Sequence, residues 1–104
     1  MLPGPPPVPV DVRERVGSQA VAEVALLREV VRRDCRSLLG GGSPIALTVD
    51  LSFDASGREA GRSIVGSGPL PLALRTCVLL ANAGSLRVDP PGAPMGARVQ
   101  MELP

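Results

Sequence analysis

In the ten residues from Ile45 to Asp54, large apolar side chains alternate strictly with smaller ones, which are polar at every position except Ala46. In a β-strand such alternation places every large apolar side chain on one face, so that face is buried and the other meets water. Segments with helical periodicity lie on both sides of this strand, and each carries one of the two cysteines of the chain, Cys35 and Cys77. Two amphipathic helices are therefore available to cover the apolar face of a small sheet.

The segment before the strand contains no proline from Asp11 to Leu39, and Gly40-Gly41-Gly42 ends it. Asp11 with Glu14 three residues later is a possible capping box for the start of a helix, and Gly17 and Ser18 offer a second start. The chain before Asp11 is rich in proline, with residues 2–9 typical of polyproline II. We therefore expect a proline-rich linker at residues 1–17 and a folded domain at residues 18–104. The apolar residues recur every three or four positions, which predicts one buried helical face. They are Val16, Ala20, Val24, Leu27, Val31, Cys35 and Leu38.

The remaining segments predict a hairpin, a second helix and a last strand. Asp54-Ala55-Ser56-Gly57 is typical of a tight turn, after which residues 58–66 return as a weaker strand. A helix is expected from about Pro71 to Ala83, and its many leucines indicate that it is well buried. Its apolar stripe comprises Leu70, Leu74, Cys77, Val78 and Ala81. The last strand alternates from Ala97 to Leu103.

The order helix, strand, strand, helix, strand predicts an α+β fold of two layers. Because each strand keeps one polar face, we expect both helices on the same face of a three-stranded antiparallel sheet. The hairpin pairs the first two strands, and a right-handed crossover through the second helix brings the third strand beside the first. The third strand then lies at an edge of the sheet.

The two cysteines can meet if both helices share one face of the sheet. A Cys35–Cys77 disulfide would stabilise the fold by roughly 3–4 kcal/mol in the chain-entropy model, and would place the protein outside the reducing cytosol. The alternative is two buried free thiols, which would place it in the cytoplasm. We expect no metal site, because the chain has no histidine and no Cys-x-x-Cys.

Catalytic groupings are hard to find in this sequence. Without histidine there is no imidazole base or triad. Asp50 and Asp54 would lie roughly 13 Å apart on one strand, too far for a carboxylate pair, and Gly66-Ser67-Gly68 lacks the lysine of a phosphate-binding loop. A net charge of +1 gives no basic field for nucleic acid. The chain has no apolar run of about 18 residues, so we expect no membrane span in it. Because the catalytic groupings above are missing, we expect neither an enzyme nor a cofactor.

Several segments follow one another in a particular order over roughly residues 28–104. They are Val31-Arg32-Arg33-Asp34-Cys35, the strand 47–57, Val65-Gly66-Ser67-Gly68-Pro69-Leu70, Leu74-Arg75-Thr76-Cys77-Val78, Pro90-Pro91 and the strand 97–103. In this order they resemble the TonB C-terminal-domain family, and most closely the AgmX/PglI-type C-terminal domains of gliding-motility proteins. The chain differs at Arg36 and at Asp89-Pro90, where the family commonly has an aromatic residue and Phe-Pro.

The resemblance implies a non-catalytic periplasmic domain that belongs to an inner-membrane-anchored protein or is processed from one. Such domains take part in energy transduction or gliding motility and bind an extended peptide of an envelope partner, such as an outer-membrane component, by strand addition at the last strand. The resemblance places this site at Ala97, Arg98, Val99, Gln100, Met101, Glu102 and Leu103, with Arg98, Gln100 and Glu102 flanking the peptide. Two alternatives remain: a homo-oligomer formed through the same edge, and, if the thiols are free, a cytosolic small-molecule-binding or enzyme accessory domain.

Overall fold

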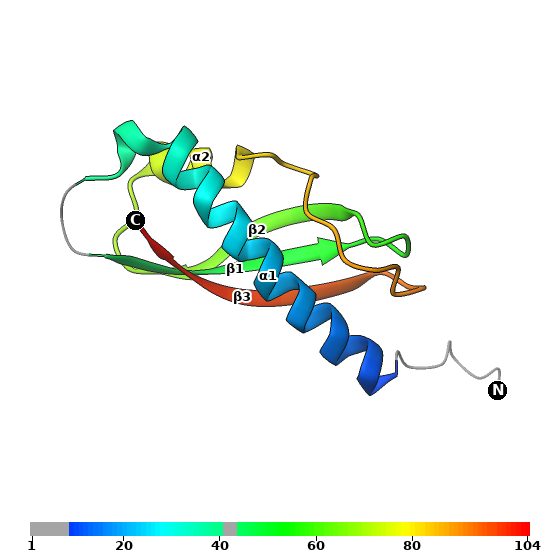
Figure 1. The fold of residues 1–104 in the computed structure, drawn as a ribbon. Helices are drawn as coiled ribbons and strands as arrows, with labels where there is room; N and C mark the ends of the chain where they lie inside the picture. The colour runs from blue at the N-terminus through cyan, green and yellow to red at the C-terminus, as the bar shows by residue number, and fades with distance from the viewer. Residues whose placement is uncertain (1–8, 41–43) are drawn as a thin grey trace.

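A computed structural model shows a three-stranded sheet covered by two helices (Figure 1). The structure describes residues 9–40 and 44–104, so most of the expected polyproline II segment and two residues of the glycine turn, Gly41 and Gly42, lie outside the described residues. The elements in chain order are α1 (Val10–Asp34), the short 3₁₀ helix η1 (Arg36–Leu38), β1 (Ile45–Phe53), β2 (Glu59–Ser67), α2 (Leu72–Leu80) and β3 (Met95–Leu103).

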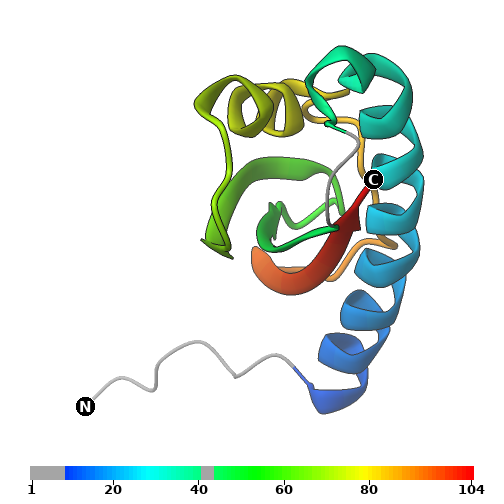
Figure 2. The ribbon, with the colours of Figure 1, turned by 90° about the vertical axis from the view of Figure 1, so that its left-hand side faces the viewer.

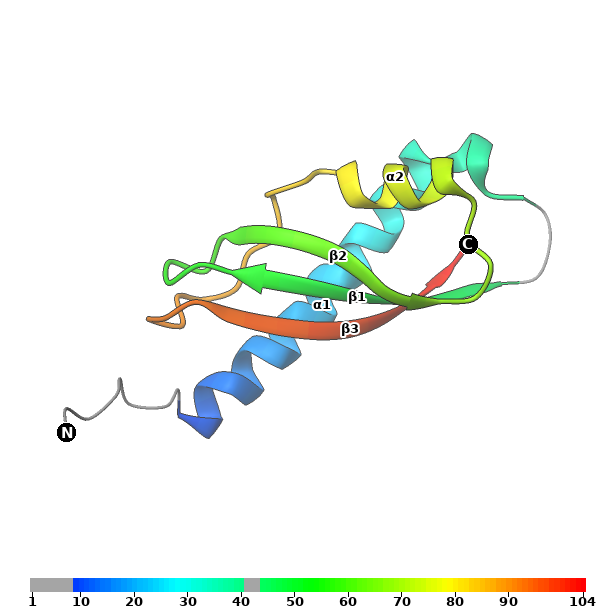
Figure 3. The ribbon, with the colours of Figure 1, turned by 180° about the vertical axis from the view of Figure 1, so that it is seen from behind.

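The sheet has the order β2-β1-β3, and β1 pairs antiparallel with both neighbours. Both helices lie on the same side of it: α1 runs diagonally along the side of β3, and α2 lies near β2 (Figure 2). Seen from behind, the strands cross in front of α1, and α2 lies above β2 (Figure 3). The predicted α+β class, the element order and the antiparallel three-stranded sheet are confirmed.

The alternation of β1 determines where the core sits. The apolar side chains from Leu47 to Phe53 turn toward the helices and are at most 2% exposed, and Ile45 at the start of the strand is partly buried. The polar side chains of β1 face the uncovered side of the sheet. The helix α1 contributes its stripe of apolar residues from the other layer, which together with the strand residues forms one continuous core. The buried members on β1 and α1 are Leu47, Val49, Leu51, Phe53, Val16, Ala20, Val24, Leu27 and Val31.

The first helix differs from the prediction at both ends. It begins at Val10 and continues through Gly17, so residues 10–17, which we expected in the linker, are helical. Val16 is 1% exposed, and burying it offsets the cost of about 1 kcal/mol for a glycine inside a helix. At the other end α1 stops at Asp34, and Leu38 lies in η1 with 39% of its surface exposed rather than on the buried stripe.

The second helix is shorter and less buried than the prediction. It spans Leu72–Leu80, and only Leu74 and Val78 within it are buried, whereas Leu72 is 76% exposed and Leu80 is 68% exposed. The expectation of a well-buried helix is therefore wrong. The physical reason is position: α2 packs one face against β2 and the end of α1, so leucines on its other faces have no layer above them.

The strand β2 contains two bulges, at Ala60 and Val65, where one residue has no partner on β1. In a regular strand Glu59 and Arg62, three positions apart, would point to opposite faces. The bulge at Ala60 turns both toward the helical layer, where Arg62 Nε donates to Glu59 Oε2 at 2.7 Å. Both side chains are almost completely buried, at 3% and 2% exposure.

This buried ion pair joins β2 to the end of α2. Arg62 Nη1 donates to the carbonyl oxygens of Val78 at 2.8 Å and Ala81 at 2.7 Å, where the helix ends and its partial charge is negative. Glu59 Oε1 accepts from the backbone N–H groups of Gly84 and Leu86 in the following loop. The cluster therefore satisfies backbone groups that burial would otherwise leave without partners.

Candidate protein-interaction edge

The two cysteines come together at one end of the helical layer. Their sulfur atoms are at disulfide distance, and their Cα atoms are 6.0 Å apart, within the usual range for a disulfide. Cys35, just after α1, is completely buried, and Cys77 in α2 is half-buried. The pair links α2 to the end of α1.

The last strand lies at an edge of the sheet, where its outer side pairs with no strand in the described part of the chain. All the residues named for the predicted site lie on it, but the structure divides them into two sets. Val99, Met101 and Leu103 belong to the buried core, and Ala97 packs partly against it. Arg98, Gln100 and Glu102 are exposed. A partner can reach the side chains of the second set, and Ala97 in part.

One hydrogen bond shows which backbone groups of β3 point outward. Arg28 of α1 donates from Nε to the carbonyl oxygen of Glu102 at 2.6 Å, so this carbonyl faces away from β1. Along a strand of an antiparallel pair, the N–H and C=O groups of one residue bond to the partner strand, and those of the next residue point away from it. The N–H and C=O groups of Gly96, Arg98 and Gln100 therefore also point outward, whereas those of Val99 face β1.

Arg28 also limits the length of this free edge. Its Nη2 donates to the carbonyl oxygen of Pro104 at 2.8 Å, in addition to the bond to Glu102. The end of β3 is thus already occupied by a side chain of α1. The stretch that is left for another strand runs from Gly96 to Gln100.

A hollow of about 420 Å³ lies beside this stretch, between α1 and β3. It is lined by Arg13 and Gly17 of the helix and by residues 94–98 of the connection and strand. Arg13, Gly17 and Val21 follow one another at intervals of four residues, which places them along one side of the helix. Val21 is 57% exposed. The edge of β3 is therefore flanked by a helix surface that is recessed at Gly17.

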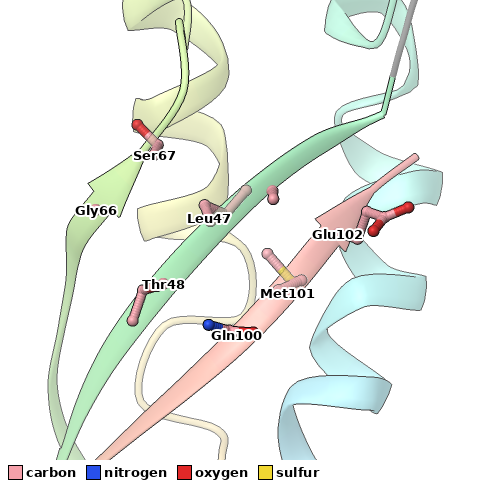
Figure 4. A pocket seen from close by; sticks show the side chains of 8 residues that line it. Leu47, Thr48, Gly66, Ser67, Gln100, Met101 and Glu102 are labelled. Atoms are coloured by element: carbon pink, nitrogen blue, oxygen red, sulfur yellow. The ribbon is translucent and has the colours of Figure 1, made fainter.

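The uncovered face of the sheet is polar. Arg98 forms an exposed ion pair with Asp50 across the two strands, at 3.6 Å. A second hollow, of about 330 Å³, extends over all three strands, with both helices behind them in the view of Figure 4. Its lining is Ala46, Leu47, Thr48, Gly66, Ser67, Gln100, Met101 and Glu102. Within residues 9–40 and 44–104, no three potential metal-binding side chains cluster together.

Asp54 serves the turn between β1 and β2. Its Oδ1 accepts hydrogen bonds from Ser56 Oγ at 2.6 Å and from the N–H groups of Ser56 and Arg58. The bond from the Ser56 hydroxyl, followed by that from the Arg58 N–H, lowers the pKa of Asp54 below its ordinary value. Asp54 is thus occupied in shaping the hairpin.

Sequence reasoning missed a line of polar side chains on the opposite side of α1. Glu23 Oε1 accepts from the N–H of Arg87 at 2.7 Å, and Gln19 exchanges two hydrogen bonds with Asp89, one with its N–H and one with its carboxylate. Arg15 donates to the carbonyl oxygen of Pro90. The spacing of four residues between Arg15, Gln19 and Glu23 is visible in the sequence. The sequence does not show, however, which groups of residues 87–90 these side chains bind. These contacts join α1 to the connection before β3.

Comparison with known proteins gives no match: no family model, no curated protein and no solved structure is similar to this chain. In the described segments, no helix combines the length and the apolar character needed to cross a bilayer. The β3 edge and the cysteine pair are therefore the features of this chain from which we infer a function.

Proposed function

We propose that this chain is a non-catalytic protein-interaction domain, which binds an extended segment of a partner protein as a fourth strand beside β3. The observation that carries the proposal is the row of outward backbone groups from Gly96 to Gln100. An open edge of this kind can accept another strand through main-chain hydrogen bonds. TonB-like domains, which this chain resembles in its sequence pattern, use their last strand in this way.

The surroundings of the edge also favour an extended peptide. An added strand would run about 4.8 Å from β3, between the flank of α1 and the solvent. Its side chains would alternate between the helix flank at Gly17 and Val21 and the open face that carries Arg98 and Gln100. Both faces of such a peptide would therefore find contacts on this domain.

We place this activity in the periplasm, in a protein of the cell envelope. The support is the Cys35–Cys77 pair, because disulfides persist in oxidising compartments and are rare in the cytosol. Trapping thiols with an alkylating reagent in intact cells should leave both cysteines unmodified until a reductant is added. Rapid alkylation of both cysteines without reductant would contradict this location.

The binding proposal is tested by removing one outward N–H group. Ten-residue peptides selected from a random phage-displayed library on the wild-type domain serve as ligands. Gln100→Pro removes an N–H that faces the partner, at an edge position where proline is tolerated. We expect its dissociation constant for these peptides to rise at least tenfold, with little change in melting temperature.

The matched control is Gln100→Ala, which removes the same side chain but keeps the N–H, and it should bind within about threefold of wild type. Val99→Pro is unsuitable because its N–H faces β1. Equal binding by Gln100→Pro and Gln100→Ala would contradict strand addition, as would failure to select any peptide. A concentration-dependent dimer that only Gln100→Pro dissociates would identify a second copy of the chain as the occupant instead.

A further inference from the structure

The hollow at Gly17 indicates the chemistry of the segment that binds at the edge. We infer that the partner places an acidic side chain there, against the guanidinium group of Arg13. This inference rests on the proposed function, because it assigns one side-chain position of the added strand.

The flank of α1 beside β3 is recessed at Gly17. Gly17 is the only residue of the line Arg13, Gly17 and Val21 without a side chain, and a Cβ built on it would meet no atom within 4 Å. The space beside it is therefore open rather than filled by the domain itself. On the strand side, Gly96 and Ala97 are also small and leave the hollow wide.

Two arginines, Arg13 and Arg98, line the hollow and differ in whether their charge is paired. Among the described residues, the Arg13 side chain has no ion pair or hydrogen-bond acceptor, whereas Arg98 on the opposite wall is paired with Asp50. Arg13 lies in the first turn of α1, where the partial charge of the helix is also positive. An anion at this place would be attracted by both charges.

The nearest carboxylates on the same helix do not line the hollow. By helical geometry Asp11 lies about 200° round the helix from Arg13, whereas Glu14 lies about 100° from Arg13 and about 60° from Gly17. The walls of the hollow are formed by Arg13, Gly17 and residues 94–98, without either carboxylate. An acidic group in the hollow therefore has to come from the bound segment.

The register of the added strand against β3 determines which of its side chains enters the hollow. A strand paired with β3 sends alternate side chains toward the helical layer. A side chain near the level of Gly96 would enter the hollow, and one with a carboxylate could reach the guanidinium group one helical turn away. The neighbouring side chain on that face would lie further along, toward the exposed surface of Val21.

The experiment uses fluorescein-labelled peptides of the form Gly-Ser-(Thr-Val)₃-Gly-Ser, in which a single Glu or Gln replaces each central residue in turn. Fluorescence anisotropy gives the dissociation constant for the wild-type domain. We expect one position at which Glu binds at least fivefold more tightly than Gln, with a preference that declines as salt is raised. In Arg13→Gln this preference should disappear while the Gln peptides bind as before.

A second variant tests the hollow itself. Gly17→Leu fills the space and improves helix propensity, so the fold should be kept or stabilised. Binding should weaken at least tenfold. The matched control is Ser18→Leu, which adds the same side chain about 100° further round the helix and should leave binding unchanged.

The outcomes separate this inference from the function on which it rests. If the peptides bind and Gln100→Pro weakens them, but Glu and Gln are equivalent at every position, the acidic subsite is wrong and strand addition stands. Retention of the Glu preference in Arg13→Gln, or wild-type binding by Gly17→Leu, also contradicts the inference. If no peptide binds the wild-type domain, both proposals fail.

Discussion

At the scale of single residues, Gly57 shows how one backbone position connects distant parts of the fold. It ends the turn between β1 and β2 with a φ angle of +89°, in the left-handed region that favours glycine. Its carbonyl oxygen accepts from the N–H of Val88 at 2.9 Å. A Cβ added here would overlap the carbonyl oxygen of Val88, which leaves no room for a side chain.

We therefore expect Gly57→Ala to destabilise the domain more than Gly84→Ala, measured as free energy of unfolding in urea. Gly84 also has a positive φ angle, of +80°, but a Cβ there meets no atom within 4 Å. Gly84→Ala is therefore the control, and its loss of stability measures only the cost of placing alanine in the left-handed conformation, about 1–2 kcal/mol. Equal losses for the two variants would show that the contact with Val88 carries no energy.

At the scale of elements, two segments with the same Glu-x-x-Arg motif differ in how deeply their ion pairs are buried. Glu29-x-x-Arg32 and Glu59-x-x-Arg62 both form ion pairs at a spacing of three residues. The first lies on the outer surface of α1, with the Arg32 side chain 47% exposed; the second lies between β2 and α2, with the Arg62 side chain 3% exposed. A regular helix brings residues three apart together, whereas a strand does so here only because of the bulge at Ala60.

This contrast predicts very different costs for the same substitution. Arg62→Met should destabilise the domain by about 3–5 kcal/mol, because the Glu59 carboxylate is left buried without its partner. Arg32→Met removes an exposed pair and should cost less than about 1 kcal/mol. Thermal and urea unfolding of both variants measure the difference. A loss below about 1 kcal/mol for Arg62→Met would show that α2 is held to β2 by other contacts.

At the scale of the whole molecule, the two helices are held to the sheet by different kinds of contact. The long helix α1 is fixed by its apolar stripe and by polar contacts with the connection before β3. The short helix α2 buries only Leu74 and Val78 and depends on the Glu59–Arg62 cluster and the cysteine pair. A domain of this size has a modest core, so one crosslink makes a large contribution to its stability.

Reduction of the disulfide should therefore lower the free energy of unfolding by roughly 3–4 kcal/mol, in the chain-entropy model for a link across 42 residues. Urea titrations with and without dithiothreitol measure this change. The double variant Cys35→Ser/Cys77→Ser is the control, and its stability should not respond to reductant. A wild-type protein that is equally insensitive would contradict a structural disulfide.

Much of the architecture follows from local patterns. The alternation of residues 45–54 defines the buried face of β1, and the stripe from Val16 to Val31 defines the face of α1 that covers it. These periodicities depend on the geometry of a single strand or helix, so they are visible without any partner. The meeting of Cys35 and Cys77 follows from the same patterns, once both helices share one face of the sheet.

Other features depend on contacts between segments far apart in the chain, and only the tertiary structure decided them. Whether Glu59 is buried depends on a register shift against β1 and on the end of α2. Which N–H groups of β3 are free depends on pairing with β1 and on Arg28. The hollow at Gly17 depends on how α1 lies beside β3. The sequence alone determined the layers of this protein, whereas long-range packing and backbone hydrogen bonding decided which surface is left open.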